Sequence, residues 1–190
     1  MTVKNLFRNA TLALACATLS GCMPTMTVEE MKAEMPQRPA ELDHLNAFVG
    51  QWEMEGETKM AGLEEVLKTH GTSDMQWHGD KWFLVGNWNF TMGAFGETTG
   101  IETWTYDAKS KKFRSTWTDS MGSTGTGTGS YDDKTKTWQM RIKSYGPFGT
   151  TIGKGHVKMI DDDTLEWTWT EYAMCGLMKT MEMTGTNRRK

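Results

Sequence analysis

The chain has 190 residues, with 21 basic and 24 acidic side chains and a formal net charge of −3. This balance leaves no surplus of lysine and arginine to neutralise phosphates, which excludes nucleic acid as a partner. About 150 residues remain after an N-terminal targeting segment and a tether, enough for one domain with a true core.

The first 21 residues, 1–21, are expected to be a secretion signal. Lys4 and Arg8 make the start positive, and no acidic residue precedes Cys22. The apolar run at 10–19 is too short to span a bilayer, which needs roughly 20 apolar residues. A positive start, a short apolar run and small residues before the cut are the three parts of an export signal.

The cleavage site carries more information. Leu19-Ser20-Gly21-Cys22 resembles the lipobox of bacterial lipoproteins, which implies cleavage before Cys22 and lipid on its thiol. Such a chain is anchored to a membrane rather than spanning it. Met23 stands where an inner-membrane retention signal has aspartate, so an outer-membrane position in the cell envelope is favoured. The alternative is a plain secreted protein with a buried cysteine.

Residues 22–40 are expected to form a flexible tether. The segment contains three of the four prolines of the chain and no aromatic residue, and a short amphipathic helix around Val28 and Met31 is left open. Once the signal is removed and Cys22 carries lipid, Cys175 is the remaining thiol, so an intrachain disulfide is ruled out in the mature chain.

The domain at 41–190 is expected to begin with a short helix. Leu42, Leu45 and Phe48 lie at helical spacing, and Gly50 is well placed to end the helix. After Gly50 the period changes to two. In residues 51–60 apolar and small side chains alternate with charged ones, which indicates an amphipathic strand.

Nine more strands of the same kind are expected, and no helical segment lies between them. A weak repeat, in which Tyr106–Phe113 returns as Tyr131–Trp138 and more loosely as Ile160–Trp167, supports a regular meander. Closing such a sheet removes its exposed edges, so the fold class is all-β, a single up-and-down antiparallel barrel of eight to ten strands. The strands are expected at 51–60, 66–77, 82–92, 97–106, 113–119, 123–131, 137–145, 150–160, 164–172 and 179–187.

An up-and-down barrel places alternate connections at opposite ends, and here the two sets differ. Charged turns occupy 78–81, 107–112, 132–136 and 161–163. Glycine-rich apolar loops occupy 61–63, 93–96, 120–122, 146–149 and 173–178. Loops are usually polar because they face water. The apolar rim is therefore expected either to fold inward as a cap or to form the mouth of a site.

Gly50-Gln51-Trp52, where the helix meets the first strand, resembles the Gly-x-Trp signature of lipocalins and related calycins. That resemblance implies that Gly50 and Trp52 form the barrel floor and that a basic residue of the last strand, Arg188 or Arg189, packs across the tryptophan.

A wider resemblance rests on four motifs: His44-Leu45-x-x-Phe48-Val49-Gly50-x-Trp52, Tyr106-Asp107, Trp117-x-Asp119-Ser120-Met121-Gly122 and Ile160-Asp161-Asp162-Asp163-Thr164. Their order and spacing are similar to the bacterial family known as domain of unknown function 1579. The resemblance covers most of 43–190. It implies a lipocalin-like barrel, often in a lipoprotein, and it carries no established activity.

The favoured function is non-catalytic binding of a small apolar or amphipathic ligand at the apolar rim. Asp119 and Glu171 continue the apolar faces of their strands, so both acids are expected to point into the upper cavity and to suit a greasy ligand with a polar or cationic head. The expected ligand-binding residues are Trp88, Phe90, Met92, Phe95, Trp117, Asp119, Met121, Tyr145, Phe148, Trp169, Glu171, Met174 and Met178.

Two other classes of function stay open. The apolar rim could dock a membrane or a partner protein, or Asp119 and Glu171 could act as an acid–base pair in an enzyme. A monomer is expected.

No cofactor is predicted. Thioethers and the thiol near Met174 and Met183 are ligands that Cu(I) prefers, and His70 or His156 could hold haem, but ordinary packing is favoured in each case. The alternating glycines of 124–129 allow a close approach or a sharp bend, and they are not a phosphate loop.

Overall fold

The computed structural model describes residues 25–147 and 149–190. The predicted signal, Cys22 and Phe148 lie outside the described residues. The chain divides into two compact units at Gln37 and Arg38. In the first unit, α1 (Val28–Ala33) begins with a capping box in which Thr27 and Glu30 hydrogen-bond each other's backbone. No helix within the described ranges has the length and apolar character needed to cross a bilayer.

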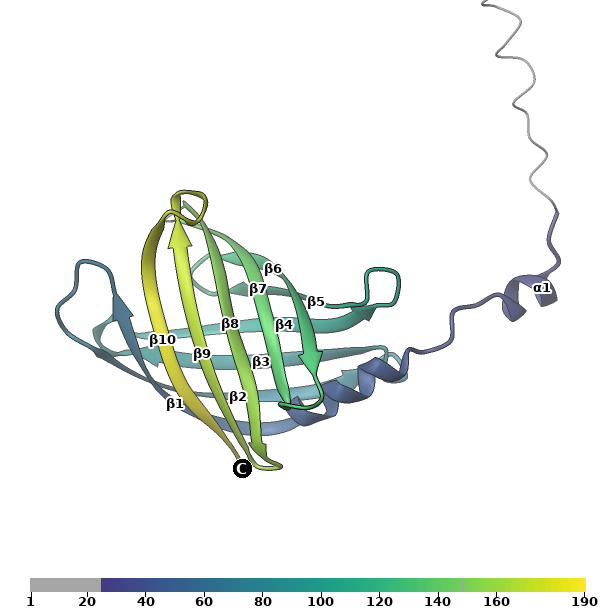
Figure 1. Cartoon of the computed structure of the whole chain (residues 1–190), viewed down its shortest axis with the longest axis horizontal. Helices are drawn as coiled ribbons and strands as arrows, with labels where there is room; N and C mark the ends of the chain where they lie inside the picture. The colour runs from purple at the N-terminus through teal and green to yellow at the C-terminus, as the bar shows by residue number, and fades with distance from the viewer. Residues whose placement is uncertain (1–24, 148) are drawn as a thin grey trace, which may run out of the picture. The chain divides into compact units, whose positions relative to one another are not determined.

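The second unit is a closed antiparallel barrel in which each strand pairs with the next and β1 pairs with β10 (Figure 1). In Figure 1 the strands β8 to β10 run steeply across β2 to β4, so the two halves of the barrel cross. The strands are β1 (Gly50–Met60), β2 (Leu67–His78), β3 (Phe83–Met92), β4 (Glu97–Asp107), β5 (Lys112–Asp119), β6 (Thr124–Asp132), β7 (Thr137–Gly146), β8 (Gly149–Asp161), β9 (Thr164–Ala173) and β10 (Met178–Arg189).

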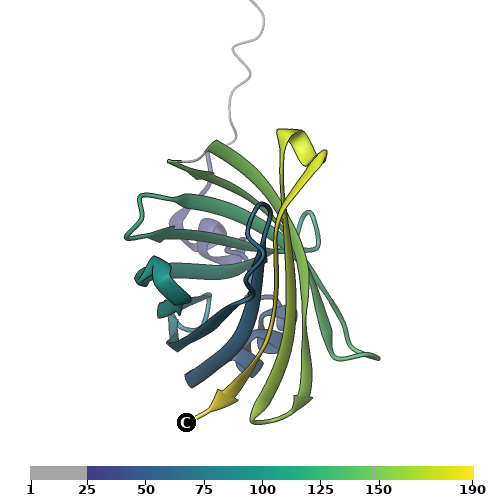
Figure 2. The same ribbon diagram turned by 90° about the vertical axis from the view of Figure 1, so that its left-hand side faces the viewer.

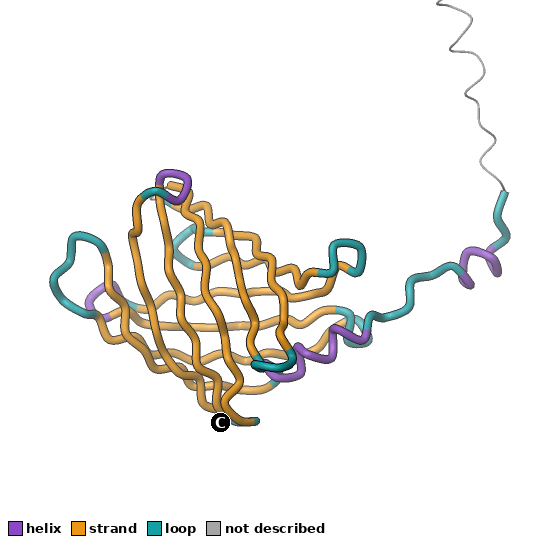
Figure 3. Tube along the Cα trace, in the orientation of Figure 1, coloured by secondary structure: helices purple, strands orange, loops and turns teal. Residues whose placement is uncertain are grey.

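The expected all-β barrel is confirmed, with every strand where alternation placed it, to within two residues at each end. The connections are short, and Figure 3 shows strand along nearly the whole barrel, with single helical turns at η3 (Gly93–Phe95) and η4 (Met174–Gly176). The up-and-down order puts the charged turns at one end and the apolar loops at the other.

The expected short helix before β1 is confirmed as a 3-10 helix, η2 (Ala40–Phe48). It closes the end with the charged turns (Figure 2). Leu42 and Leu45 are fully buried there, against Leu84 and Phe113. Because β1 starts directly after η2, this packing fixes the floor of the barrel.

The sequence repeat is a repeated turn. Asp107, Asp132 and Asp161 each use Oδ1 to accept the backbone N–H two residues later, at 2.9–3.0 Å. At the first turn, hydrogen bonds from Ser110 and Arg114 lower the pKa of Asp107 to about 2. These turns are exposed and charged, so they define a solvated rim.

Candidate functional site

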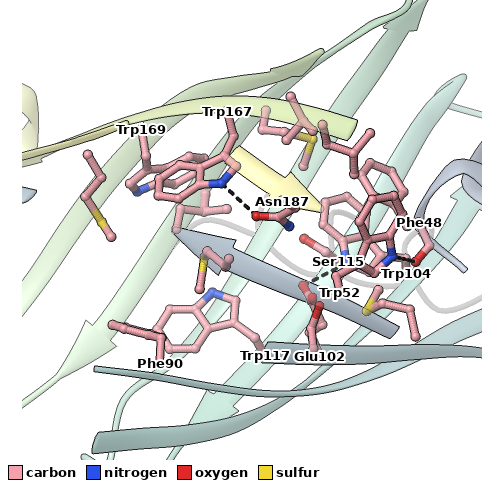
Figure 4. A pocket seen from close by; sticks show the side chains of 18 of the residues that line it. Phe48, Trp52, Phe90, Glu102, Trp104, Ser115, Trp117, Trp167, Trp169 and Asn187 are labelled. Carbon is pink, nitrogen blue, oxygen red and sulfur yellow. Dashed lines mark hydrogen bonds between the residues drawn. The ribbon is translucent and has the colours of Figure 1, made fainter. Parts of the chain in front are cut away.

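A cavity of about 340 Å³ lies inside the barrel, between the floor and the middle of the strands. Seven aromatic rings and four methionines dominate its wall (Figure 4). It is lined by Phe48, Trp52, Met54, Ser73, Met75, Phe90, Glu102, Trp104, Ser115, Trp117, Met140, Ile142, Val157, Leu165, Trp167, Thr168, Trp169, Met183 and Asn187.

The cavity stays hollow because tryptophan rings lie flat on glycines of neighbouring strands. A Cβ at Gly125 would collide with the ring of Trp117, and a Cβ at Gly153 would collide with the ring of Trp169. A glycine on the inner face lets a large ring lie along the wall instead of projecting across the barrel. The close approach at the alternating glycines of β6 is therefore made by side chains of this chain.

Trp52 forms the floor. Its side chain is 2% exposed, and its Nε1 donates a 2.8 Å hydrogen bond to the carbonyl of Phe48 at the end of η2. The guanidinium carbon of Arg189 lies 4.2 Å from the centre of the Trp52 ring. Arg189 also donates to Val49 and to the carbonyl of Asp162, so it joins the last strand to the helix end and to the β8–β9 turn.

The basic residue over Trp52 is thus Arg189, and the expected role of Arg188 is corrected. Arg189 pairs across the β1–β10 ladder with Trp52, whereas Arg188 pairs with Glu53 on the outer face. Neighbouring residues of a strand point to opposite faces.

Glu102 is the site residue that sequence reasoning missed. It lies on the inner face of β4 beside Trp104, whose Nε1 donates a 2.8 Å hydrogen bond to Glu102 Oε2. Burial raises the pKa of the Glu102 carboxyl, and this bond opposes the rise only in part. The missed signal was the alternation of β4, in which Gly100, Glu102 and Trp104 share one face.

Asn187 supplies a second polar group to the wall. Its Oδ1 accepts a 2.8 Å hydrogen bond from Trp167 Nε1 (Figure 4). Its amide nitrogen has no partner among the described residues. The arrangement therefore offers a donor on the β10 side and a carboxyl on the β4 side of a mainly apolar chamber.

Three of the expected ligand-binding residues, Phe90, Trp117 and Trp169, line the cavity. Trp88 lies on the same inner face, with its ring stacked 5.3 Å from that of Phe90. Met92 shares that face nearer the apolar loops, opposite Thr69 of β2. These placements move the centre of the site from the rim to the barrel interior.

The two expected acids are not brought together. Asp119 is on β5 and Glu171 on β9, with three strands between them. Asp119 Oδ1 accepts the backbone N–H groups of Met121 and Ser123, at 2.9 Å each. Glu171 accepts hydrogen bonds from Thr151 and Trp169 at 3.0 and 3.1 Å. Asp119 therefore stabilises its own loop, and neither acid lines the cavity.

The remaining rim residues face solvent. Phe95 is 55% exposed and Met174 65%, and Met121 and Met178 are exposed as well. Tyr145 is corrected to the outer face of β7, where the ammonium of Lys143 lies 5.0 Å from its ring centre. The exposure of these side chains does not fit loops folded inward as a lid.

The candidate metal and haem ligands are dispersed. His70 and His156 lie on the outer face, and His156 contacts Thr168. Met183 lines the cavity, whereas Met174 and Cys175 lie in the exposed η4 loop. Within the described residues no group of three or more His, Cys, Asp or Glu could hold a metal ion.

Comparison with known proteins identifies the family and the fold. The model of DUF1579, a protein of unknown function, matches residues 37–189. Rv2717c from M. tuberculosis superposes with a TM-score of 0.61 at 14% identity, covering 81% of this chain and 99% of that one. The S-type phycobiliprotein lyase CPES from Guillardia theta gives 0.56 at 7% identity, covering 87% and 98%. No curated protein sequence matches. At these identities the structural likeness concerns the fold alone.

Proposed function

This chain belongs to the DUF1579 family of proteins of unknown function, and we propose that its barrel binds one small, mainly apolar ligand without catalysis. The observation that carries the proposal is the aromatic cavity of about 340 Å³. Sites for small molecules have volumes of roughly 300–1,000 Å³, with mostly apolar walls and a few placed polar groups. Glu102 and Asn187 supply such polar groups here.

We further propose that this binding takes place at the cell envelope, with the barrel tethered through lipid on Cys22. The ordered export signal and the Leu19-Ser20-Gly21-Cys22 sequence support the anchor. A tethered binding protein holds its ligand near a membrane, where apolar molecules concentrate.

Replacing Cys22 with serine tests the anchor. Cys22→Ser is expected to release the protein from membranes or to leave an uncleaved precursor, since the acylated thiol is absent. Membrane fractionation and the mass of the mature chain measure both effects, with Cys175→Ser as the matched control. Unchanged mass and unchanged membrane association in Cys22→Ser would refute the anchor.

A second candidate function is favoured by the apolar rim. Leu177 is 87% exposed, and Phe95, Met174 and Met178 are exposed at the same end of the barrel. A patch of this kind is typical of an interaction surface. We propose that the rim contacts the lipid surface to which the tether holds the barrel.

Placing a negative charge on the rim tests whether the rim contacts lipid or forms the mouth of the cavity. Phe95→Asp and Met174→Asp, in a chain starting after Cys22, are expected to lose vesicle binding because a carboxylate resists burial among lipid chains. Binding of an apolar fluorescent probe to the cavity should stay within about twofold of wild type, since neither side chain lines it. Thr135→Asp, at an exposed position of the charged β6–β7 turn, is the control. Loss of probe binding with retained vesicle binding would instead make the rim the mouth of the site.

A further inference from the structure

The ionisable groups that line the cavity include an acid and no base. Glu102 is the one ionisable side chain among the residues that line it, and the wall contains no lysine, arginine or histidine. Everything else that faces the space is an aromatic ring, a thioether, an aliphatic group, a hydroxyl or an amide. A carboxyl in such a place is costly to ionise unless a positive group pairs with it.

The Glu102 carboxyl is only half engaged by the protein. Trp104 bonds to Oε2, and Oε1 has no hydrogen-bond partner among the described residues. The residue opposite Glu102 on β3 is Gly86, and the side chain next to Gly86 is the apolar Met75. On this side, therefore, no polar side chain covers the carboxyl. One carboxyl oxygen is therefore left for a ligand.

Charged groups on the elements packed around Glu102 do not neutralise it. On the inner faces of β3 and β5 the one charged residue is Asp119, which stabilises its own loop. From η2, Glu41 accepts a hydrogen bond from the hydroxyl of Tyr106, and His44 stacks on Tyr131. Asp43 of η2 pairs with Arg38.

The opposite wall also lacks a cation for Glu102. Glu171 is bonded to Thr151 and Trp169, and Arg189 lies over Trp52 at the floor and pairs with Asp163. Within the described part of the chain, a positive partner for Glu102 has to come from outside the protein.

Aromatic faces complete the site. β4 and β9 are separated by four strands in either direction around the closed ring, so Glu102 and the ring pair Trp167 and Trp169 lie on opposite walls (Figure 4). Tryptophan faces attract cations as well as flat apolar rings. A flat molecule can stack on one wall while its positive end meets the carboxyl on the other.

We propose that the ligand of this cavity is a planar apolar molecule with one positive charge, and that this charge pairs with the Glu102 carboxylate. The inference rests on the proposed binding function and names its ligand class. The proposal predicts the direction in which the affinity for a cationic ligand changes with pH. Burial raises the pKa of Glu102, so the empty site stays protonated above the ordinary carboxyl range. A cation selects the ionised form, so its affinity rises with pH until Glu102 is ionised in the empty protein.

The test uses two probes and the full chain. Thioflavin T is a flat benzothiazole with a fixed positive charge, and its uncharged analogue lacks the N-methyl group. Because neither charge state changes with pH in the neutral and mildly acidic range, a pH dependence reports the protein. Affinities are measured by fluorescence titration for wild type, Glu102→Gln and the control Glu166→Gln, which removes the same charge from the exposed face of β9.

Wild type and Glu166→Gln are expected to prefer the cation, increasingly so as pH rises. Glu102→Gln should weaken thioflavin T by about tenfold or more, leave the uncharged probe within about twofold, and remove the pH dependence. An unchanged preference in Glu102→Gln, or wild-type affinity for the cation that does not rise with pH, would overturn the inference while the uncharged probe still binds. If neither probe binds wild type, the proposed binding function fails with it. The wild-type pH profile decides the question even if Glu102→Gln does not fold.

Discussion

Trp52→Ala is expected to lower the free energy of unfolding by roughly 3–5 kcal/mol, the range for truncating a buried tryptophan. The side chain is 2% exposed, so its removal leaves a void at the floor. The hydrogen bond to Phe48 and the contact with Arg189 are lost with it. This is a large part of the stability of a small domain.

Thermal unfolding followed by circular dichroism measures this loss. The Tm of Trp52→Ala should fall by at least about 6 °C. Trp82→Ala is the matched control, because Trp82 lies outside the strands in the β2–β3 turn and is 37% exposed. Equal Tm values for Trp52→Ala and wild type would show that Trp52 does not hold the floor.

Gly125→Val is expected to abolish ligand binding in a chain that still folds. A Cβ at this position collides with the Trp117 ring, so the ring has to turn into the cavity that it now borders. Overpacking of this kind costs about 1–3 kcal/mol of stability, and the space for a ligand is lost. Affinity for the uncharged benzothiazole should fall by about a hundredfold or more.

Thr126→Val is the matched control for this prediction. Thr126 follows Gly125 on β6 but is exposed on the outer face, so the methyl group that replaces its hydroxyl does not reach the cavity. Both variants are titrated with the probe after circular dichroism has shown an intact barrel. Wild-type affinity in folded Gly125→Val would mean that the probe binds elsewhere.

Alternation in the sequence was enough to predict the barrel, because the side-chain period of a strand is two whatever its partners are. It also predicted Trp117 and Trp169 as inward rings, and both line the cavity. Tyr145 could have been assigned outward by the same rule, since Met140, Ile142 and Ser144 form the inner face of β7. The prediction placed Tyr145 in the site because it lies beside the apolar rim, although the alternation of β7 puts it on the outer face.

The height of a residue along the barrel axis could not be predicted from the sequence. That height depends on strand tilt and stagger, which are set by the pairing of all ten strands. Asp119 and Glu171 were therefore both expected in an upper cavity, while Glu102, further from the loops, was missed. The choice between Arg188 and Arg189 likewise depended on the β1–β10 register. In addition, the Asp119 carboxylate accepts hydrogen bonds from backbone N–H groups of its own turn. The alternation of inward and outward residues in a strand does not predict such a local hydrogen bond.

The central claim is that the barrel is hollow and holds one small molecule inside. Native mass spectrometry of the full chain, mixed with the uncharged benzothiazole, tests it most directly. The account predicts a complex with one probe per chain for wild type and for Thr126→Val, and a bare chain for Gly125→Val. A bare wild-type chain, or equal complexes for wild type and folded Gly125→Val, would contradict it.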